Sequence, residues 1–344
     1  DALLDKEYGV LSTLADIEAV GHRVVHGAEE FVCSQLITDE VIAQLEKCSV
    51  FAPLHNPANI LGIKAVSSAL PTVPQVGVFD TAFHQTMPAY AYMYALPYEY
   101  YDKYRIRRYG FHGTSHKYVS AKGAKFAGLE LGYSKIITCH LGNGSSIAAV
   151  VNGKSIDTSM GFTPLDGFMM GTRTGTLDPS AITFIAEKEN MTIKEMNNFI
   201  NKKCGLNGIT GGVVDMRDIM AGKREGKERE IYAFDMFAYR VKKYIGAYAA
   251  AMGGVDAILF TGGIGENAWW QRQEICRGLE FLGAEIDEKQ NESMAGQDGI
   301  ISKESSRVKI LSVTTDEELV IVEEENVDMN SVVPEKKENE AKDE

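Results

Sequence analysis

The stretch from His140 to Ser146 constrains the fold more than any other part of the sequence. It reads His-Leu-Gly-Asn-Gly-Ser-Ser, and largely apolar runs lie on both sides of it at 136–139 and 147–151. This order predicts a strand, a glycine-rich turn and a second strand. The bare backbone N–H groups of such a turn suit a phosphate. Two interpretations stay open at this point, a phosphate-binding turn and an ordinary hairpin with a Gly-Asn-Gly tip.

Strand-like and helix-like segments alternate along the chain, which predicts an α/β or α+β fold. Apolar periodicity, capping residues and glycines mark the clearest elements. They are strands at 73–79 and 257–261, a helix capped by Thr38, a helix with a capping box of Thr192 and Glu195, and a long helix over 228–252 that stops at Gly253-Gly254.

Length, charge and cysteine content limit the class of protein. A chain of 344 residues suits two domains. Its net charge of −13 argues against nucleic acid or an anionic membrane as a partner, and no apolar run reaches the length of a membrane span. The five cysteines are widely spaced, which fits a reducing, cytoplasmic location. The charged segment 326–344 is predicted to be a mostly disordered tail.

Three polar side chains stand out as candidates for chemistry. Asp80 follows an apolar strand, where α/β proteins build active sites, and it could hold a metal ion or orient a reacting group. Arg173 is the sole cation in a glycine-containing loop that we expect to be flexible, so it could swing onto developing charge. His112 lies between Phe111 and Gly113, and we favour a functional role for it. For Arg107 and Arg108 we favour a solvated basic turn.

Two glycine-flanked segments have competing interpretations. The segment 262–267 follows a strand and opens a helix, so it is either a nucleotide-binding turn or a tight structural turn; it matches neither the dinucleotide nor the Walker pattern. The segment 21–27 carries His22 and His26 around a Val-Val pair. That pair favours a strand with both histidines on one face, and disfavours a metal-binding helix.

Seven motifs together resemble the acetokinase family, and the resemblance covers residues 16–322. They are Gly-His-Arg-Val-Val-His-Gly (21–27), Pro-Leu-His-Asn-Pro (53–57), Phe-Asp-Thr-Ala-Phe-His (79–84), Arg-Tyr-Gly-Phe-His-Gly-Thr-Ser-His (108–116), the turn at 140–146, Met-Gly-Thr-Arg (170–173) and Phe-Thr-Gly-Gly-Ile-Gly-Glu-Asn (260–267). The resemblance implies an α/β, actin-like (ribonuclease H-like) two-domain kinase fold with a cleft between the domains.

The same resemblance implies the reaction, the cofactor and the assembly. The reaction is reversible phosphoryl transfer between ATP and acetate, which gives ADP and acetyl phosphate. Mg²⁺ is the implied metal, with Mn²⁺ as the alternative, and a homodimer is the implied assembly. The implied domains are an incomplete first domain (1–84 with 315–325), a second, nucleotide-binding domain (85–314) and the tail (326–344).

Site roles follow from the resemblance, position by position. Arg23, Asp80, His112 and Arg173 are the implied catalytic residues, and Glu317 is the implied metal ligand. The implied acetate pocket consists of Arg23, Val25, Leu54, Phe111 and Pro164. The implied phosphate and nucleotide contacts are His55, His140, Leu141, Gly142, Asn143, Gly144, Asp215, Met216, Arg217, Gly263, Ile264, Gly265 and Asn267.

The sequence departs from the family pattern at three places. Thr176 stands where an acidic residue is usual, and Gly-Gly-Val-Val (211–214) replaces a serine-rich stretch. The family's opening Asn-x-Gly-Ser-Ser-Ser loop is absent, so we expect the chain to begin inside the first domain and to transfer phosphate poorly. Propionate or butyrate as the acid, and a non-catalytic nucleotide-binding fragment, remain the alternatives.

Overall fold

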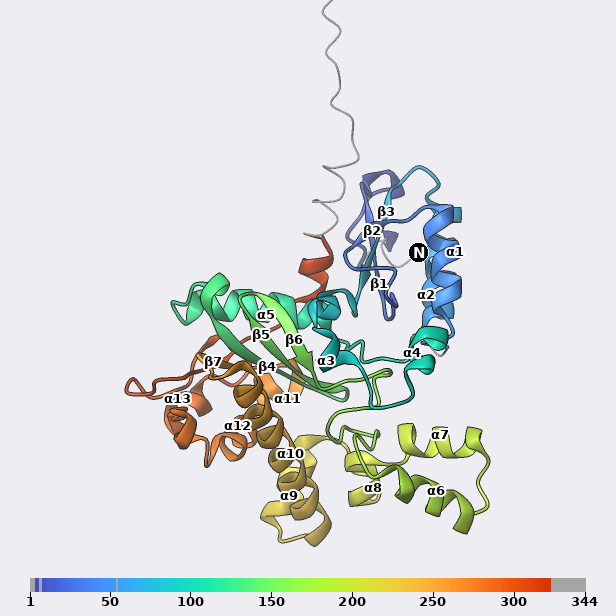
Figure 1. Cartoon of the computed structure of the whole chain (residues 1–344). Coiled ribbons are helices and arrows are strands. Elements are labelled where there is room, and N and C mark those ends of the chain that lie inside the picture. Colours follow the sequence, from blue (N-terminus) through green and yellow to red (C-terminus); the bar gives the residue numbers. More distant parts are fainter. Residues whose placement is uncertain (1–3, 6–7, 54, 323–344) are drawn as a thin grey trace, which may run out of the picture. The chain divides into compact units, whose positions relative to one another are not determined.

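The computed structural model describes residues 4–5, 8–53 and 55–322 (Figure 1). Contacts divide the chain into two compact units, one formed by the residues up to Ala82 together with those from Glu317, the other by Phe83–Asp316. We call these the first and the second unit. The predicted division into domains stays a prediction, and both Leu54 and the predicted tail lie outside the described residues.

The first unit contains a three-stranded sheet. In it β1 (Val20–Val24) pairs in parallel with β3 (Gln75–Phe79), and β2 (Gln35–Leu36) pairs antiparallel with β3. The helices α1 (Asp39–Cys48) and α2 (Asn56–Ala69) pack on this sheet through a core that includes Leu45 and Ile63. The hydroxyl of Thr38 accepts a hydrogen bond from Val41 N at 3.3 Å, which confirms the predicted cap.

The prediction that His22 and His26 share one strand face is wrong. Strand β1 ends at Val24, and His26 lies beyond it. The reason is a side chain that replaces the sheet ladder: Asn56 Nδ2 donates to the His26 carbonyl at 2.8 Å, and His26 N donates to Asn56 Oδ1 at 3.2 Å. Both backbone groups are thereby satisfied outside the sheet.

The second unit is built on a six-stranded sheet of order β6-β5-β4-β7-β9-β8. The first three strands are antiparallel neighbours, and β7 and β9 continue the sheet in parallel with β4. Their bounds are β4 Lys135–Leu141, β5 Ser145–Val151, β6 Lys154–Thr158, β7 Ala257–Thr261, β8 Gly299–Ile300 and β9 Lys309–Ser312. The predicted strand–turn–strand around 142–144 is therefore the β4–β5 hairpin, and the strand at 257–261 is confirmed.

Two helices cover opposite faces of this sheet, as the alternation of strand residues requires. Ile137, Cys139 and Leu141 pack in one core with α10 (Glu228–Met252). Ile136 of the same strand packs in another core with Val119 of α5 (Gly113–Phe126). Even-numbered residues of β4 therefore face α5. The predicted bounds of α10 and its glycine stop are confirmed, since Gly253 takes the left-handed conformation.

The remaining helices of the second unit are short. They are α3 (Ala89–Tyr92), α4 (Tyr98–Tyr104), α6 (Pro179–Lys188), α7 (Ile193–Lys202), α8 (Gly205–Thr210), α9 (Met216–Arg224), α11 (Gly262–Asn267), α12 (Trp269–Cys276) and α13 (Glu288–Ser293). The capping box of Thr192 and Glu195 at α7 is present as predicted. Among the described residues, no helix is both long and apolar enough to span a bilayer.

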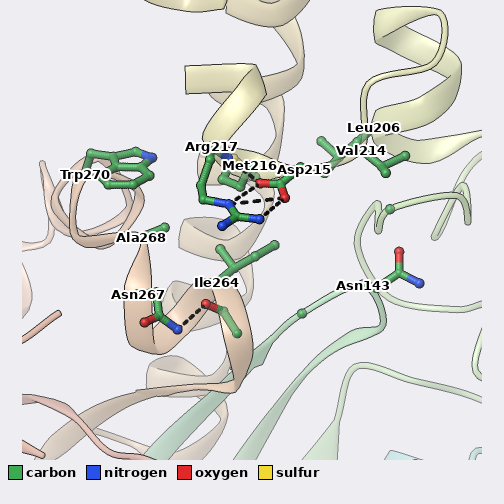
Figure 2. Close-up of a pocket in the computed structure, with 13 residues that line it drawn as sticks. Asn143, Leu206, Val214, Asp215, Met216, Arg217, Ile264, Asn267, Ala268 and Trp270 are labelled. Atoms are coloured by element: carbon green, nitrogen blue, oxygen red, sulfur yellow. Dashed lines mark hydrogen bonds and ion pairs between the residues drawn. The ribbon is translucent and has the colours of Figure 1, made fainter. Parts of the chain in front are cut away.

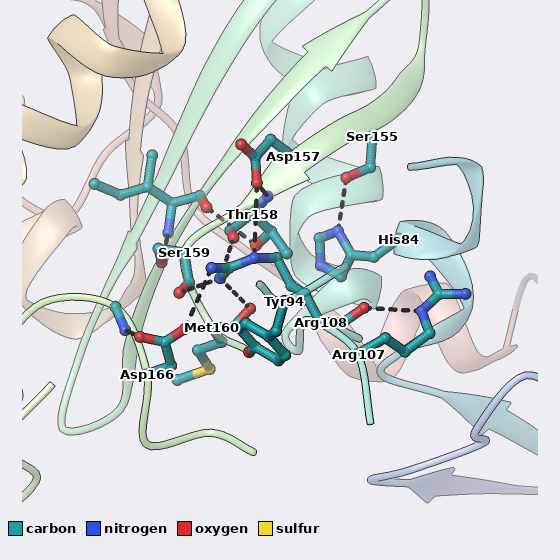
Figure 3. Close-up of polar contacts among 12 residues, drawn as sticks. His84, Tyr94, Arg107, Arg108, Ser155, Asp157, Thr158, Ser159, Met160 and Asp166 are labelled. Carbon is teal, nitrogen blue, oxygen red and sulfur yellow. Dashed lines mark hydrogen bonds and ion pairs between the residues drawn. The ribbon is translucent and has the colours of Figure 1, made fainter. Parts of the chain in front are cut away.

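The expectation of a solvated basic turn at Arg107 and Arg108 is wrong. Arg107 is 4% exposed, and its guanidinium carbon lies 3.6 Å from the ring centre of Tyr92. Figure 3 shows Arg108 beneath the end of β6, where its Nη1 donates to three successive carbonyls, those of residues 158, 159 and 160, at 2.8–3.0 Å. Its Nη2 lies 3.3 Å from Asp166 Oδ2. Carbonyls and a carboxylate thus replace water around this cation.

Replacing Arg108 should destabilise the protein, because the substitution leaves buried carbonyls and Asp166 without their partner. We expect Arg108→Met to lower the free energy of unfolding by about 3 kcal/mol. Urea unfolding measures this, with Arg224→Met as the control, since Arg224 is exposed at the end of α9. Equal losses in the two variants would show that the Arg108 contacts contribute nothing to stability.

Candidate active site

A cavity of about 590 Å³ lies in the second unit (Figure 2). Most of its lining comes from three segments that are distant in sequence: the β4–β5 turn, the start of α9 and the α11–α12 region. Eight residues of the predicted nucleotide site are among its lining, namely Gly142, Asn143, Asp215, Met216, Arg217, Gly263, Ile264 and Asn267. Leu141, Gly144 and Gly265 are not, and Leu141 is fully buried in the core that faces α10.

Asp215 and Arg217 form an ion pair at the start of α9. The Asp215 carboxylate accepts from Arg217 N at 2.8 Å as the helix cap, and from Arg217 Nη2 at 2.6 Å. These bonds lower the pKa of Asp215 to about 2. The guanidinium lines the cavity, where a planar cation can stack on an aromatic base. Figure 2 shows this pair opposite Ile264 and Asn267.

The glycine-rich segment 262–267 is itself the helix α11, rather than a turn that opens a helix. Its geometry is stabilised by Arg272, a fully buried residue whose Nη1 donates to the Gly265 carbonyl at 2.8 Å and whose Nε donates to Asn291 Oδ1 at 2.7 Å. Burial lowers the pKa of Arg272 to about 10. Asn267 Nδ2 donates to the Gly263 carbonyl at 3.0 Å, so its side chain is also held.

The β4–β5 turn brings a cation and an imidazole together. A Cβ atom built on Gly144 would lie 3.3 Å from Arg173 Nη1 and 3.6 Å from His112 Nε2. The space above Gly144 is therefore bordered by a guanidinium and by one edge of the His112 ring. A tetrahedral anion such as a phosphoryl group suits this arrangement of donors.

Arg173 is a half-buried cation. Its loop, which we expected to be flexible, is held by backbone hydrogen bonds. The loop backbone is hydrogen-bonded at Gly171 N to the Asn143 carbonyl, at Thr174 N to Ile200 and at Thr176 N to Gly167. The side chain has contacts of its own. Its Nη1 donates to the Pro164 carbonyl at 3.1 Å, and no carboxylate in the described part of the chain lies within ion-pair distance. Burial lowers the pKa of Arg173, which an anion would reverse.

The first unit holds the other predicted catalytic group of charges. Arg23 donates to both carboxylate oxygens of Asp80, from Nε at 2.9 Å and from Nη2 at 2.6 Å. Asp80 is buried at the end of β3, whereas the Arg23 side chain is 45% exposed. Glu317 Oε2 lies 3.8 Å from Arg23 Nε. Burial raises the pKa of Glu317, while Arg23 opposes this and Asp80 adds to it.

These residues fit a hard divalent cation. Two carboxylates share one guanidinium, so negative charge is left over, and both supply oxygen ligands. Mg²⁺ typically takes one or two carboxylates and completes its shell with water and phosphate oxygens. The described residues contain no group of three or more histidines, cysteines or carboxylates that could hold a metal by itself. A metal bound here would thus depend on ligands from the substrate.

The remaining predicted site residues are distributed over both units. Val25 is half-buried in the first unit, and the exposed His55 precedes α2 in the same unit. Phe111 is buried in the second unit, where the Pro164 carbonyl accepts from Arg173. Val25 and Phe111 thus belong to different units.

Sequence reasoning missed several residues at the cavity. Gly171, Leu206, Val214, Ala268 and Trp270 also line it. Gly171 belongs to a quoted motif, Val214 and Ala268 adjoin predicted residues and Trp270 follows Asn267 by three positions, so a wider window would have found them. Leu206 had no local signal. The Trp270 Nε1 group is buried without a hydrogen-bond partner in the described part of the chain.

Comparisons with known proteins agree on one family. The model of the Acetokinase family matches residues 2–323. The chain belongs to the Acetokinase family. An acetate kinase of Agathobacter rectalis is 57% identical over 94% of this chain and 82% of its own length. An acetate kinase of Thermoanaerobacter pseudethanolicus is 59% identical over 94% of this chain and 81% of its own length.

Solved structures give the same result. A Porphyromonas gingivalis acetate kinase superposes with a TM-score of 0.92 at 50% identity, over 95% of this chain and 82% of that one. A Francisella tularensis propionate kinase superposes with a TM-score of 0.86 at 46% identity, over 90% of this chain and 79% of that one. The predicted actin-like α/β kinase fold is confirmed, and this member of the Acetokinase family is a phosphotransferase enzyme.

Four histidines cluster beside the β4–β5 hairpin. His112 stacks on His140 with ring centres 4.2 Å apart, and His84 lies edge-on to His116 at 5.6 Å. His84 is fully buried between the Ser155 hydroxyl, 2.7 Å from Nδ1, and the Phe111 carbonyl, 3.0 Å from Nε2. Since a carbonyl only accepts, Nε2 carries the proton. Burial lowers the pKa of His84 to about 4.

His84 should make the protein sensitive to acid. Its folded pKa lies below the unfolded value of about 6.5, so between these values the unfolded chain binds a proton that the folded chain does not. The free energy of unfolding should fall by about 3 kcal/mol as the pH drops through this window. We expect His84→Gln to flatten this slope in urea unfolding at pH 4–7, relative to His55→Gln. Equal slopes for the two variants would show that His84 does not cause the loss of stability in acid.

Proposed function

We propose that the chain transfers a phosphoryl group reversibly between ATP and acetate, with a divalent metal ion. One observation carries this proposal. The cavity that suits adenosine shares Gly142 and Asn143 with the β4–β5 turn, and the next residue of that turn, Gly144, lies beside Arg173 and His112. A nucleotide in the cavity would therefore extend its phosphates along the turn towards two donors.

The roles of the residues follow from the charges involved. Acetate is ionised at neutral pH, so the reaction needs positioning and charge neutralisation rather than a strong base. Arg173 and His112 would bind the transferring group, and Asn143 and Gly144 would contact phosphates. Asp80 would orient Arg23, which would bind the carboxylate. His55 and His140 would line the phosphate site, and Arg217 and Ile264 would hold the adenosine.

The metal would complete this arrangement. Glu317, assisted by Asp80, would hold Mg²⁺ or Mn²⁺. When bound, the metal would neutralise charge on the phosphates of ATP. We propose a homodimer on the family resemblance, and a cytoplasmic location on the widely spaced cysteines.

The acid is the least determined part of the proposal. Val25, Phe111, Pro164 and Leu54 are the proposed pocket for the methyl group, and their size favours acetate. The similarity to a propionate kinase structure keeps propionate as the second candidate. A pocket distinguishes acids that differ by one methylene by only about 1–3 kcal/mol.

A hydroxamate assay for acyl phosphate tests the function directly. The chain is supplied with ATP, a magnesium salt and acetate, propionate or butyrate, and kcat/KM is compared. We expect turnover with acetate as the preferred acid. Tight ADP binding without turnover on any of the three would instead support a non-catalytic nucleotide-binding protein.

Arg173 should matter to the transfer step more than to binding. We expect Arg173→Ala to lower kcat by about 10²–10³, because it removes a donor to developing charge, while the KM for ATP changes little. Steady-state kinetics against Arg224→Ala, an exposed arginine of the same unit, measures this. An unchanged kcat would remove Arg173 from the reaction.

Val25 should influence the choice of acid. Val25→Ala removes two methyl groups, and we expect it to raise the ratio of kcat/KM for propionate over acetate by up to about tenfold. Val32→Ala, at an exposed valine of the first unit, is the matched control. If the ratio is the same in both variants, Val25 does not contact the acid.

A further inference from the structure

A chain of four hydrogen-bonded side chains runs from the sheet to His112. Thr138 Oγ1 lies 2.6 Å from His116 Nδ1, His116 Nε2 lies 2.7 Å from Ser146 Oγ, and the same oxygen lies 2.9 Å from His112 Nδ1. Thr138, His116 and Ser146 are all fully buried. They meet because even-numbered residues of β4 and the paired residues of β5 face α5, which carries His116.

The Ser146 hydroxyl couples the two imidazoles. It has one hydrogen atom and lies between two ring nitrogens, so it can donate to one ring only and must accept from the other. If His116 donates from Nε2, Ser146 donates to His112 Nδ1. If His112 donates from Nδ1, Ser146 donates to His116 Nε2. The positions of the two ring protons are therefore linked.

Thr138 decides which group donates in each of these hydrogen bonds. Within the described part of the protein, its hydroxyl is hydrogen-bonded only to His116 Nδ1. If His116 carried a proton on Nδ1, the buried Thr138 O–H would have no acceptor, which is costly. Thr138 therefore donates to Nδ1, and burial keeps His116 neutral by lowering its pKa well below the usual value. The His116 proton is then on Nε2.

We propose that Thr138, His116 and Ser146 act as positioning residues that hold His112 with its proton on Nε2. That nitrogen borders the space above Gly144, beside Arg173 Nη1. These three residues, which we call the relay, thus make His112 present an N–H donor, rather than a bare nitrogen, where an anion would bind. This role in catalysis rests on the proposed function, whereas the position of the proton does not.

The tautomers can be read directly by NMR. Long-range ¹H–¹⁵N spectra of the histidine-labelled full chain distinguish protonation at Nδ1 from protonation at Nε2, and a His112→Asn variant assigns the resonance among the seven histidines. We expect both His112 and His116 to carry a single proton, on Nε2. A proton on Nδ1 of either ring would overturn the proposal.

Variants then test the coupling. In Ser146→Ala the donor to His112 Nδ1 is lost, so we expect both tautomers of His112 and a fall in kcat of about tenfold, as for other orienting partners, at constant KM for ATP. Ser146→Thr keeps the hydroxyl and should keep one tautomer. Thr138→Val should lower kcat when it is introduced alone. Added to Ser146→Ala, it should lower kcat no further, because Thr138 acts only through Ser146.

The two ways of failing are distinguishable. A parent chain without turnover contradicts the proposed function, while its NMR spectrum still decides the relay. A Ser146→Ala spectrum with the proton still wholly on Nε2, or a kcat that falls equally for Thr138→Val in both backgrounds, would show that these residues are merely structural and would overturn the proposal.

Discussion

The antiparallel register of β4 and β5 is the constraint on which the second unit depends. It places His140 opposite Ser146, and residues opposite each other in such a pair point to the same face. Apolar residues of this face pack against α5 further along the hairpin, and polar ones meet His112 and His116 near the turn. A slip of one residue would turn this polar strip towards the apolar core of α10. The hydrophobic pattern that stabilises the sheet therefore also positions the candidate catalytic groups.

Burial and hydrogen-bond partners distinguish the arginines with a structural role from those suited to bind a ligand. Arg108 and Arg272 are enclosed by carbonyls and polar side chains, so their charge is already compensated within the protein. Arg23 and Arg217 are each held by one aspartate and keep an exposed part. Arg173 is half-buried, and its hydrogen-bond partners among the described residues are a carbonyl and a thioether. Of these five arginines, Arg173 has the least compensated charge and is the best suited to bind an anion that arrives and leaves.

Local signals in the sequence predicted the regular elements well, because they are local in origin. The cap at Thr38, the long helix 228–252 and the glycine turn each depend on residues close in the chain. The errors arose where distant residues decide the outcome. Asn56 draws His26 out of the strand, Asp166 and β6 carbonyls bury Arg108, and backbone bonds from Asn143 and Ile200 fix the loop of Arg173. Likewise, the resemblance supplied the nucleotide residues, while Leu206 reaches the cavity only through tertiary packing.

The central claim is that one cavity and one turn bind the nucleotide and direct its phosphates to Arg173 and His112. A crystal structure of this chain with bound ADP tests it most directly. The account predicts adenosine between Arg217 and Ile264, with the diphosphate along Gly142–Gly144 and its terminal phosphate nearest Arg173. Adenosine outside this cavity, or a diphosphate that points away from Gly144, would contradict it.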